Sequence, residues 1–149
     1  MGKVNYAAID IGSNAVRLLI KSIDREAVQE KKIKKVMMLR VPLRLGFDVF
    51  SIGELSEKKA DKLRRLMKAF RQLMKIYDVD DYRACATSAM RDARNGRTII
   101  KKIEKDTGIR IEIIDGQEEA RMIYNNHIEC MDCLLYTSPS PRDRSLSRM

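Results

Sequence analysis

The sequence predicts an α/β fold built on a mixed sheet. Short apolar segments typical of β-strands open the chain, and from residue 56 onward helix-periodic segments alternate with further short apolar segments. Strands that alternate with helices are typical of crossover units, which place parallel strands side by side. The length of 149 residues and the hydrophobic fraction of 44% suit one globular domain.

Three strands are expected at the start of the chain. Residues 4–11 form a short apolar segment that leads into a turn of small polar residues at positions 12–14. Residues 15–23 place alternate apolar side chains on one face, which favours a second strand. Residues 28–39 are expected to form a third strand with lysines at its exposed positions.

Helices and strands are expected to alternate after a connecting segment. Residues 41–53 are interrupted by one proline and two glycines and are expected to form only connecting structure. Residues 56–77 predict the clearest helix, because apolar residues recur three and four positions apart. They are Leu63, Leu66, Met67, Phe70, Leu73, Met74 and Tyr77. A second helix at residues 98–107 is expected to end at Gly108 in a left-handed C-cap. The remaining expected elements are strands at residues 82–86 and 110–114, and a helix from residue 115 to about 125.

Composition and charge exclude several classes of protein. The formal net charge of +9 suits a polyanionic partner. Aromatic residues make up only 5% of the chain and tryptophan is absent, so a surface for stacking nucleic-acid bases is not expected. No apolar segment approaches the ~18 residues of a membrane span, and no export signal is evident. We therefore expect a cytoplasmic protein with neither a membrane nor a nucleic acid as its partner.

The last part of the chain differs in composition from the rest. Residues 134–149 are rich in Ser, Pro and Arg, resemble the translated read-through of a sequencing adapter, and are expected to be disordered. The expected domain therefore comprises residues 1–133. Cys130 and Cys133 have C-x-x-C spacing, but one such pair with the lone His127 does not complete a tetrahedral zinc site. Two ordinary thiols are expected more than a metal or redox site.

Three short motifs carry the candidate chemistry, and the first is Asp10-Ile11-Gly12-Ser13-Asn14. Gly12 allows the backbone to approach a ligand closely, and the side chains of Ser13 and Asn14 can donate hydrogen bonds to phosphate oxygens. Asp10, at the end of a strand, suits a hydrated Mg²⁺ ion. Since the same residue types also form ordinary hairpin turns, spacing alone leaves both interpretations open.

The second motif is the sequence Thr-Ser-Ala-Met-Arg-Asp-Ala at residues 87–93. A strand passes into a helix start here, where exposed backbone N–H groups favour anions. Arg91 has the fork geometry that suits a phosphate group. The alternative is a helix cap at Thr87 or Ser88, with Arg91 paired to Asp92 or to solvent.

The third motif is the sequence Asp-Gly-Gln-Glu-Glu-Ala-Arg at residues 115–121. Asp115 and Glu118 have the spacing of a capping box. Glu119 is turned about 100° around the helix from Glu118 and is left to project into a cleft. A carboxylate in that position can orient and deprotonate a water that attacks a phosphate. The alternative is a surface carboxylate that interacts with the helix dipole.

The three motifs in this order resemble the Ppx/GppA family of exopolyphosphatases and guanosine pentaphosphate phosphohydrolases, over residues from about 4 to 126. The resemblance implies the first domain of the actin-like ATPase superfold, which is ribonuclease H-like and shared by sugar kinases, heat-shock chaperones and actin. In that superfold two α/β domains close over a phosphorylated ligand. The implied activity is Mg²⁺-dependent hydrolysis of the terminal phosphoanhydride of polyphosphate or of guanosine pentaphosphate.

The resemblance also implies a role for individual residues. Glu119 would be the catalytic base, and Asp10 would lie near the metal. The implied phosphate-binding residues are Gly12, Ser13, Asn14 and Arg91. The residues implied as secondary neighbours of the site are Glu118, Arg17 and Ser88.

Members of the family continue into a second domain with another phosphate loop, which this sequence does not contain. The first domain is therefore expected to be truncated, with one wall of the cleft missing and little or no turnover by this chain alone. A homodimer is a possible state of the full-length parent. The alternative function is a non-catalytic regulator that binds polyphosphate or guanosine pentaphosphate.

Overall fold

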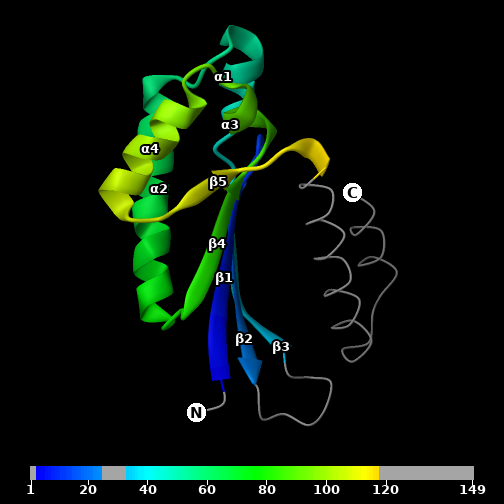
Figure 1. Ribbon diagram of the computed structural model, residues 1–149, viewed down its shortest axis with the longest axis vertical. Coiled ribbons are helices and arrows are strands. Elements are labelled where there is room, and N and C mark those ends of the chain that lie inside the picture. Colours follow the sequence, from blue (N-terminus) through cyan, green and yellow to red (C-terminus); the bar gives the residue numbers. More distant parts are fainter. Residues whose placement is uncertain (1–2, 25–32, 118–149) are drawn as a thin grey trace.

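The computed structural model describes residues 3–24 and 33–117 as a mixed sheet with flanking helices (Figure 1). The strands are β1 (Lys3–Ile11), β2 (Val16–Asp24), β3 (Ile33–Val41), β4 (Asp81–Ala86) and β5 (Ile111–Ile113). The helices are α1 (Leu45–Ile52), α2 (Glu57–Ile76), α3 (Ser88–Asp92) and α4 (Gly96–Thr107). The expected α/β class with a mixed sheet is confirmed.

The strand order determines which ends of the strands meet. The sheet has the order β3-β2-β1-β4-β5. The β1–β2 and β2–β3 pairs are antiparallel, whereas β1–β4 and β4–β5 are parallel. The carboxyl ends of β1, β4 and β5 therefore lie at the same end of the sheet. Figure 1 shows α1 and α3 at this end, while α2 and α4 lie along one face.

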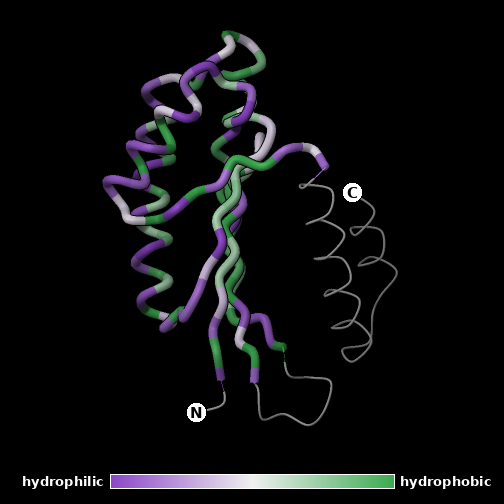
Figure 2. Tube along the Cα trace, viewed as in Figure 1, coloured by the Kyte–Doolittle hydropathy of each residue, from purple (hydrophilic) through white to green (hydrophobic). Residues whose placement is uncertain are grey.

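The core lies between that face and the two longer helices. Alternate side chains of β1 and β2 are buried in register: Ala7, Ile9 and Ile11 opposite Ile20, Leu18 and Val16. They belong to one apolar cluster with Phe70 of α2 and Ile103 of α4. In Figure 2 the middle of the sheet is predominantly apolar, whereas α2 and α4 alternate between polar and apolar residues. This is the pattern of helices that bury one side.

Most of the expected elements agree with the structure within a few residues. Helix α2 begins after Ser56, whose side chain accepts a hydrogen bond from the backbone N–H of Lys59 at 3.3 Å. Helix α4 begins two residues before its expected start and ends at Gly108, whose φ of 77° confirms the predicted left-handed C-cap. The third strand is described from Ile33 and continues to Val41, two residues beyond its expected end.

The expectation of connecting structure at residues 41–53 is wrong, because Leu45–Ile52 form α1. The proline lies ahead of the helix and Gly53, with φ of 81°, ends it, so these residues mark its limits. The segment is held against α2 by Lys59, whose Nζ donates to the carbonyl oxygen of Arg44 at 2.6 Å and lies 3.6 Å from Asp48. The backbone N–H of Ser56 also donates to Asp48, at 3.2 Å.

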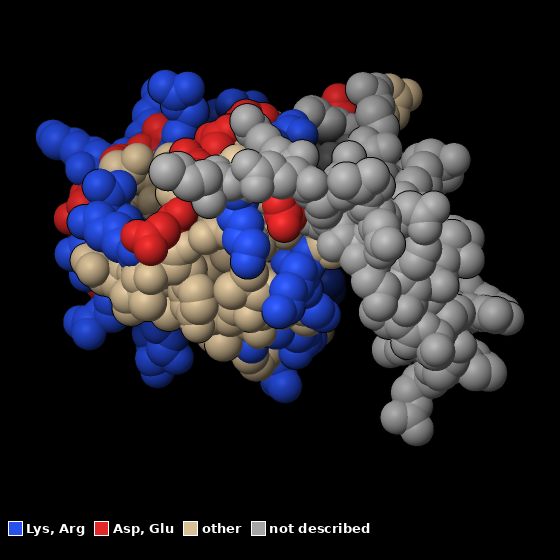
Figure 3. Space-filling view, turned by 90° about the horizontal axis from the view of Figure 1, so that it is seen from below, with Lys and Arg blue, Asp and Glu red and all other residues tan. Residues whose placement is uncertain are grey.

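Charged side chains of both signs are spread over the surface. Figure 3 shows Lys and Arg around the described part of one end of the molecule, with Asp and Glu among them. Arg64 of α2 contacts Asp61 of the same helix at 2.7 Å and Asp106 of α4 at 3.0 Å. Part of the positive charge is therefore paired locally. That the protein has no nucleic-acid partner stays a prediction.

Several expectations concern parts of the chain outside residues 3–24 and 33–117. They are those for Glu118, Glu119, His127, Cys130, Cys133 and residues 134–149, together with most of the helix expected from residue 115. Within the described ranges, none of the helices combines the length and apolar character needed to cross a bilayer.

Candidate phosphate-binding site

The three sequence motifs converge at the carboxyl ends of three neighbouring parallel strands. Ile11, the last residue of β1, is in register with Ala86 at the end of β4, which pairs with Ile113 of β5. Backbone hydrogen bonds continue beyond the strands: Thr87 donates to Ile11 at 3.1 Å, and Ile114 donates to Ala86 at 3.0 Å. In open α/β sheets, this end is where ligands bind.

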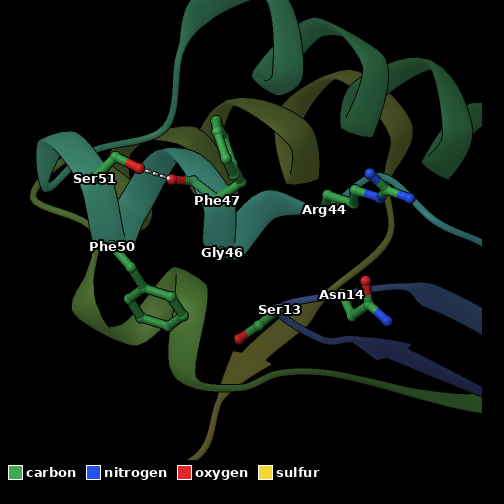
Figure 4. A pocket seen from close by; sticks show the side chains of 7 residues that line it. All are labelled: Ser13, Asn14, Arg44, Gly46, Phe47, Phe50 and Ser51. Carbon is green, nitrogen blue, oxygen red and sulfur yellow. Dashed lines mark hydrogen bonds between the residues drawn. The ribbon is translucent and has the colours of Figure 1, made fainter.

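The first motif forms a tight loop held by its own backbone and by α1. The backbone N–H of Gly12 donates to Ala15 at 3.1 Å, which closes the turn. The carbonyl oxygens of Ser13 and Asn14 accept hydrogen bonds from the backbone N–H groups of Gly46 and Arg44, at 2.8 and 2.9 Å. Because the carbonyls are directed into α1, the loop has a fixed shape from which the Ser13 and Asn14 side chains project (Figure 4).

A hydroxyl pair joins the first motif to the second. The Oγ atoms of Ser13 and Ser88 lie 2.6 Å apart, although the residues are 75 positions apart in the sequence. Ser88 is the first residue of α3, and Thr87, which precedes it, makes no side-chain capping bond. The cap that the sequence allowed at Thr87 is therefore not formed, and Ser88 contacts the loop of the first motif.

Arg91 joins the second motif to the third. Its Nη1 donates to the carbonyl oxygen of Ile114 at 2.8 Å, immediately before Asp115. The contact with Asp92 is longer, with 3.9 Å between Nε and Oδ1. The guanidinium carries five N–H donors, so the bond to Ile114 uses only a fraction of its capacity. The third motif is described only as far as Gln117.

Asp10 and Arg17 occupy adjacent positions on the sheet. They are directly opposite each other in the antiparallel register of β1 and β2, and both residues are exposed on the face away from the core. Asp10 is also in register with buried Cys85 of β4. Among residues 3–24 and 33–117, no three Cys, His, Asp or Glu side chains cluster as a metal site.

A hydrated Mg²⁺ ion fits this donor set. Mg²⁺ keeps several of its waters and commonly binds through one or two carboxylates together with the phosphates of a substrate. The Asp10 carboxylate, one position before the end of β1, would supply one oxygen ligand of this kind beside the Ser13 loop.

Helix α1 also contributes to this site, although its residues were predicted to be only connecting structure. Arg44 precedes α1 with φ of 54° and ψ of 49°, a left-handed conformation that is unfavourable for a residue with a Cβ. Together with α1 and the Ser13–Asn14 loop, it lines an open groove of about 480 Å³, which we call the α1 groove. The available signal was the pair formed by Pro42 and Gly53, which is typical of the limits of a helix.

The electrostatics next to the groove favour its folded geometry. Hydrogen bonding from Ser56, together with the charge of Lys59, holds the pKa of the Asp48 carboxyl below its ordinary value. Asp48 is therefore ionised near neutral pH and continues to bind the start of α2. Lys59, which contacts both Asp48 and the Arg44 carbonyl oxygen, joins the start of α2 to the start of α1.

Comparison with known proteins identifies the family. The sequence profile of the Ppx/GppA phosphatase family matches residues 22–133. This chain belongs to the Ppx/GppA phosphatase family. The match includes the second motif and the positions of Glu118 and Glu119, and it begins after the first motif.

Individual relatives and solved structures agree with this assignment. The bifunctional 3-dehydroquinate synthase/phosphatase of Fusobacterium nucleatum is 30% identical to this chain over 128 residues. The match covers 85% of this chain and 19% of the relative. Exopolyphosphatase 1 of Mycobacterium tuberculosis is 28% identical over 121 residues, covering 81% of this chain and 34% of the relative.

The Ppx/GppA structures share the fold. The Aquifex aeolicus family member superposes with a TM-score of 0.74 at 28% identity, over 82% of this chain and 38% of that one. An exopolyphosphatase from Cytophaga hutchinsonii gives a TM-score of 0.73 at 29% identity, over 80% of this chain and 37% of that one. The chain thus spans between 19% and 38% of the length of these relatives.

Proposed function

We propose that the convergent motifs bind the end of a phosphate chain, and that a two-domain protein containing them hydrolyses its terminal phosphoanhydride. The proposed substrates are inorganic polyphosphate and guanosine pentaphosphate. The observation that carries the proposal is the 2.6 Å contact between the Ser13 and Ser88 hydroxyls, because it joins two phosphate-type motifs at the carboxyl ends of parallel strands. Relatives named as exopolyphosphatases support it.

The loop residues have donors suited to phosphate oxygens. The Ser13 hydroxyl and the Asn14 amide project from a loop whose carbonyls are already bound to α1. Gly12 adds no side chain between the backbone and a ligand. In our proposal, Arg91 uses its remaining N–H groups to hold a phosphate while its bond to Ile114 fixes its direction. These donors are placed before the ligand arrives, so little reorganisation is needed on binding.

The hydrolytic step is assigned to Glu119, with Glu118 as its structural neighbour. The Glu119 carboxylate accepts a proton from water as the water oxygen attacks the terminal phosphorus. The bond from phosphorus to the bridging oxygen breaks, and its electron pair leaves with the shortened chain. Because phosphoryl transfer needs little covalent help from the protein, orientation and charge stabilisation supply most of the rate.

A magnesium ion would be held by Asp10 together with water and substrate oxygens. When bound, Mg²⁺ supplies positive charge that offsets the negative charge of the phosphates. Arg17, opposite Asp10 on β2, adds positive charge beside this position.

The decisive experiment joins residues 1–133 to the second domain of a family member and measures phosphate release with Mg²⁺. We expect release from polyphosphate or guanosine pentaphosphate, loss of release in Glu119→Gln, and retention of ligand binding in that variant. The 149-residue chain alone is expected to release little phosphate, since it spans only 34% and 38% of the length of two of these relatives. Ligand binding without release in the unsubstituted fusion would instead favour the non-catalytic regulator.

A further inference from the structure

An aromatic side chain projects beside the phosphate loop without contributing to the core. Phe50 of α1 is 64% exposed, whereas Leu45 and Val49 of the same helix are buried. Figure 4 shows the Phe50 ring directed toward Ser13, while Phe47 is directed the other way. The Phe47 ring already has the ammonium of Lys59 at 5.5 Å from its centroid. Phe47 is also exposed, at 73%, and also lines the groove, but of the two rings it is Phe50 that is directed toward the loop.

Gly46 brings the Phe50 ring and the loop together. A Cβ at this position would lie 2.9 Å from Cε2 of Phe50 and 2.9 Å from Cβ of Ser13. The absence of a side chain at Gly46 is therefore what lets an aromatic ring and a phosphate-type loop share one groove. Gly46 also donates its backbone N–H to Ser13 at 2.8 Å, so this close approach is fixed.

The α1 groove combines an apolar ring with positive charge. Arg44 lies above Asn14 in Figure 4, at the same groove, and its backbone N–H is bound to Asn14 at 2.9 Å. The groove, of about 480 Å³, is open to solvent. An inorganic phosphate chain presents no surface that packs on a phenyl ring. A nucleotide presents both a planar base and phosphates.

We propose that the α1 groove binds the purine base of a nucleoside polyphosphate, with the base stacked on Phe50 and its phosphates at the Ser13–Asn14 loop. This inference rests on the proposed function of that loop. Stacking supplies affinity through the face of the ring, and Arg44 offsets phosphate charge at the junction. The groove thereby makes a nucleotide a better ligand than an inorganic chain with the same number of phosphates.

The test compares GTP with inorganic tripolyphosphate on the 149-residue chain, by titration calorimetry with Mg²⁺. We expect GTP to bind about tenfold more tightly, in line with the contribution of one base stacked on an aromatic side chain. Phe50→Ala is expected to remove this preference while leaving tripolyphosphate affinity unchanged. Ile52→Ala is the matched control, because Ile52 is 56% exposed on the same helix but does not line the groove.

A spectroscopic measurement tests stacking independently of affinity. The chain has no tryptophan, so Phe50→Trp introduces a single indole at the groove and Ile52→Trp introduces one outside it. GTP is expected to quench the indole fluorescence of Phe50→Trp and not that of Ile52→Trp. Tripolyphosphate is expected to quench the fluorescence of neither variant. Equal affinities for GTP and tripolyphosphate, or an unquenched indole in Phe50→Trp, would overturn the base site. If tripolyphosphate does not bind while GTP still binds and quenches the indole, the proposed phosphate-binding role of the Ser13–Asn14 loop is wrong and the base site stands.

Discussion

Arg91 of α3 donates a hydrogen bond to the carbonyl oxygen of Ile114 at 2.8 Å. This contact fixes the direction of the chain as it leaves β5, because the acceptor lies one residue beyond that strand. The segment that follows begins the third motif. The guanidinium therefore has two tasks in our proposal, since it positions the third motif and holds a phosphate.

The first prediction concerns this dual task. Arg91→Lys keeps the charge but loses the planar fork, so we expect tripolyphosphate affinity to fall about tenfold, the value of one hydrogen bond to a charged group. Calorimetry checks the affinity. Arg97→Lys is the control, because Arg97 is an exposed residue of α4 outside the motifs. Unchanged affinity in Arg91→Lys would show that Arg91 acts as a point charge or not at all.

The second prediction concerns the two hydroxyls that join the first and second motifs. Ser13→Ala and Ser88→Ala are each expected to weaken tripolyphosphate binding by about tenfold. Each variant removes one hydroxyl donor and leaves the other hydroxyl without the partner that orients it. The loss of affinity in the double variant is expected to be smaller than the product of the two single fold-losses, because the hydroxyls lie 2.6 Å apart and act as a pair. Ser22→Ala, on β2 opposite Asn5, is the control. Strictly additive losses would contradict the coupling.

The fold was predictable where a periodic pattern extends over a whole element. The apolar stripe of α2 runs through a helix of 20 residues, and the alternation in β1 continues for nine residues. Helix α1 was missed because it has only eight residues. Its exposed Phe47 and Phe50 also obscure the buried pair Leu45 and Val49, so the segment shows no clear apolar side.

The site was predictable as three separate motifs but not as an arrangement. Asp10, Ser13, Ser88 and Arg91 stand out by residue type, and their order carries the family resemblance. Their proximity depends on β4 lying next to β1 and β5 next to β4, which is non-local pairing. No local sequence pattern predicts the contact between Ser13 and Ser88 or the hydrogen bond from Arg91 to Ile114. The roles of Glu118 and Glu119 stay predictions.

The third prediction concerns acid sensitivity of the contact between α2 and α4. Hydrogen bonds from Arg64 and Lys68 hold the pKa of Asp106 below its ordinary value of 3.8, and bonds from Arg64 and Arg65 lower the pKa of Asp61. The folded state therefore binds fewer protons than the unfolded state near these pKa values. The stabilisation is present above pH 3.8 and is lost as the pH falls through the lowered folded values.

Chemical denaturation at a series of pH values checks this acid dependence. The stability of the unsubstituted chain is expected to fall as the pH is lowered below 3.8, and Asp106→Asn is expected to show a shallower fall. High salt is expected to reduce the effect, because these pairs are exposed and screened. Equal pH profiles for the two chains would show that the pairs do not contribute.

The last prediction separates backbone strain from ligand binding at Arg44. Its φ of 54° costs a non-glycine residue about 1 kcal/mol, so Arg44→Gly is expected to raise the free energy of unfolding by about that amount. The same substitution removes the guanidinium from the α1 groove and is expected to weaken GTP binding.

Asp78→Gly is the matched control, because Asp78 has φ of 52° beyond the far end of α2. It is expected to stabilise the chain without changing GTP affinity, as unfolding and calorimetry together will show. A loss of stability in Arg44→Gly would mean that the Arg44 side chain stabilises the fold. Ligand binding would then not be the reason for an arginine at this strained position.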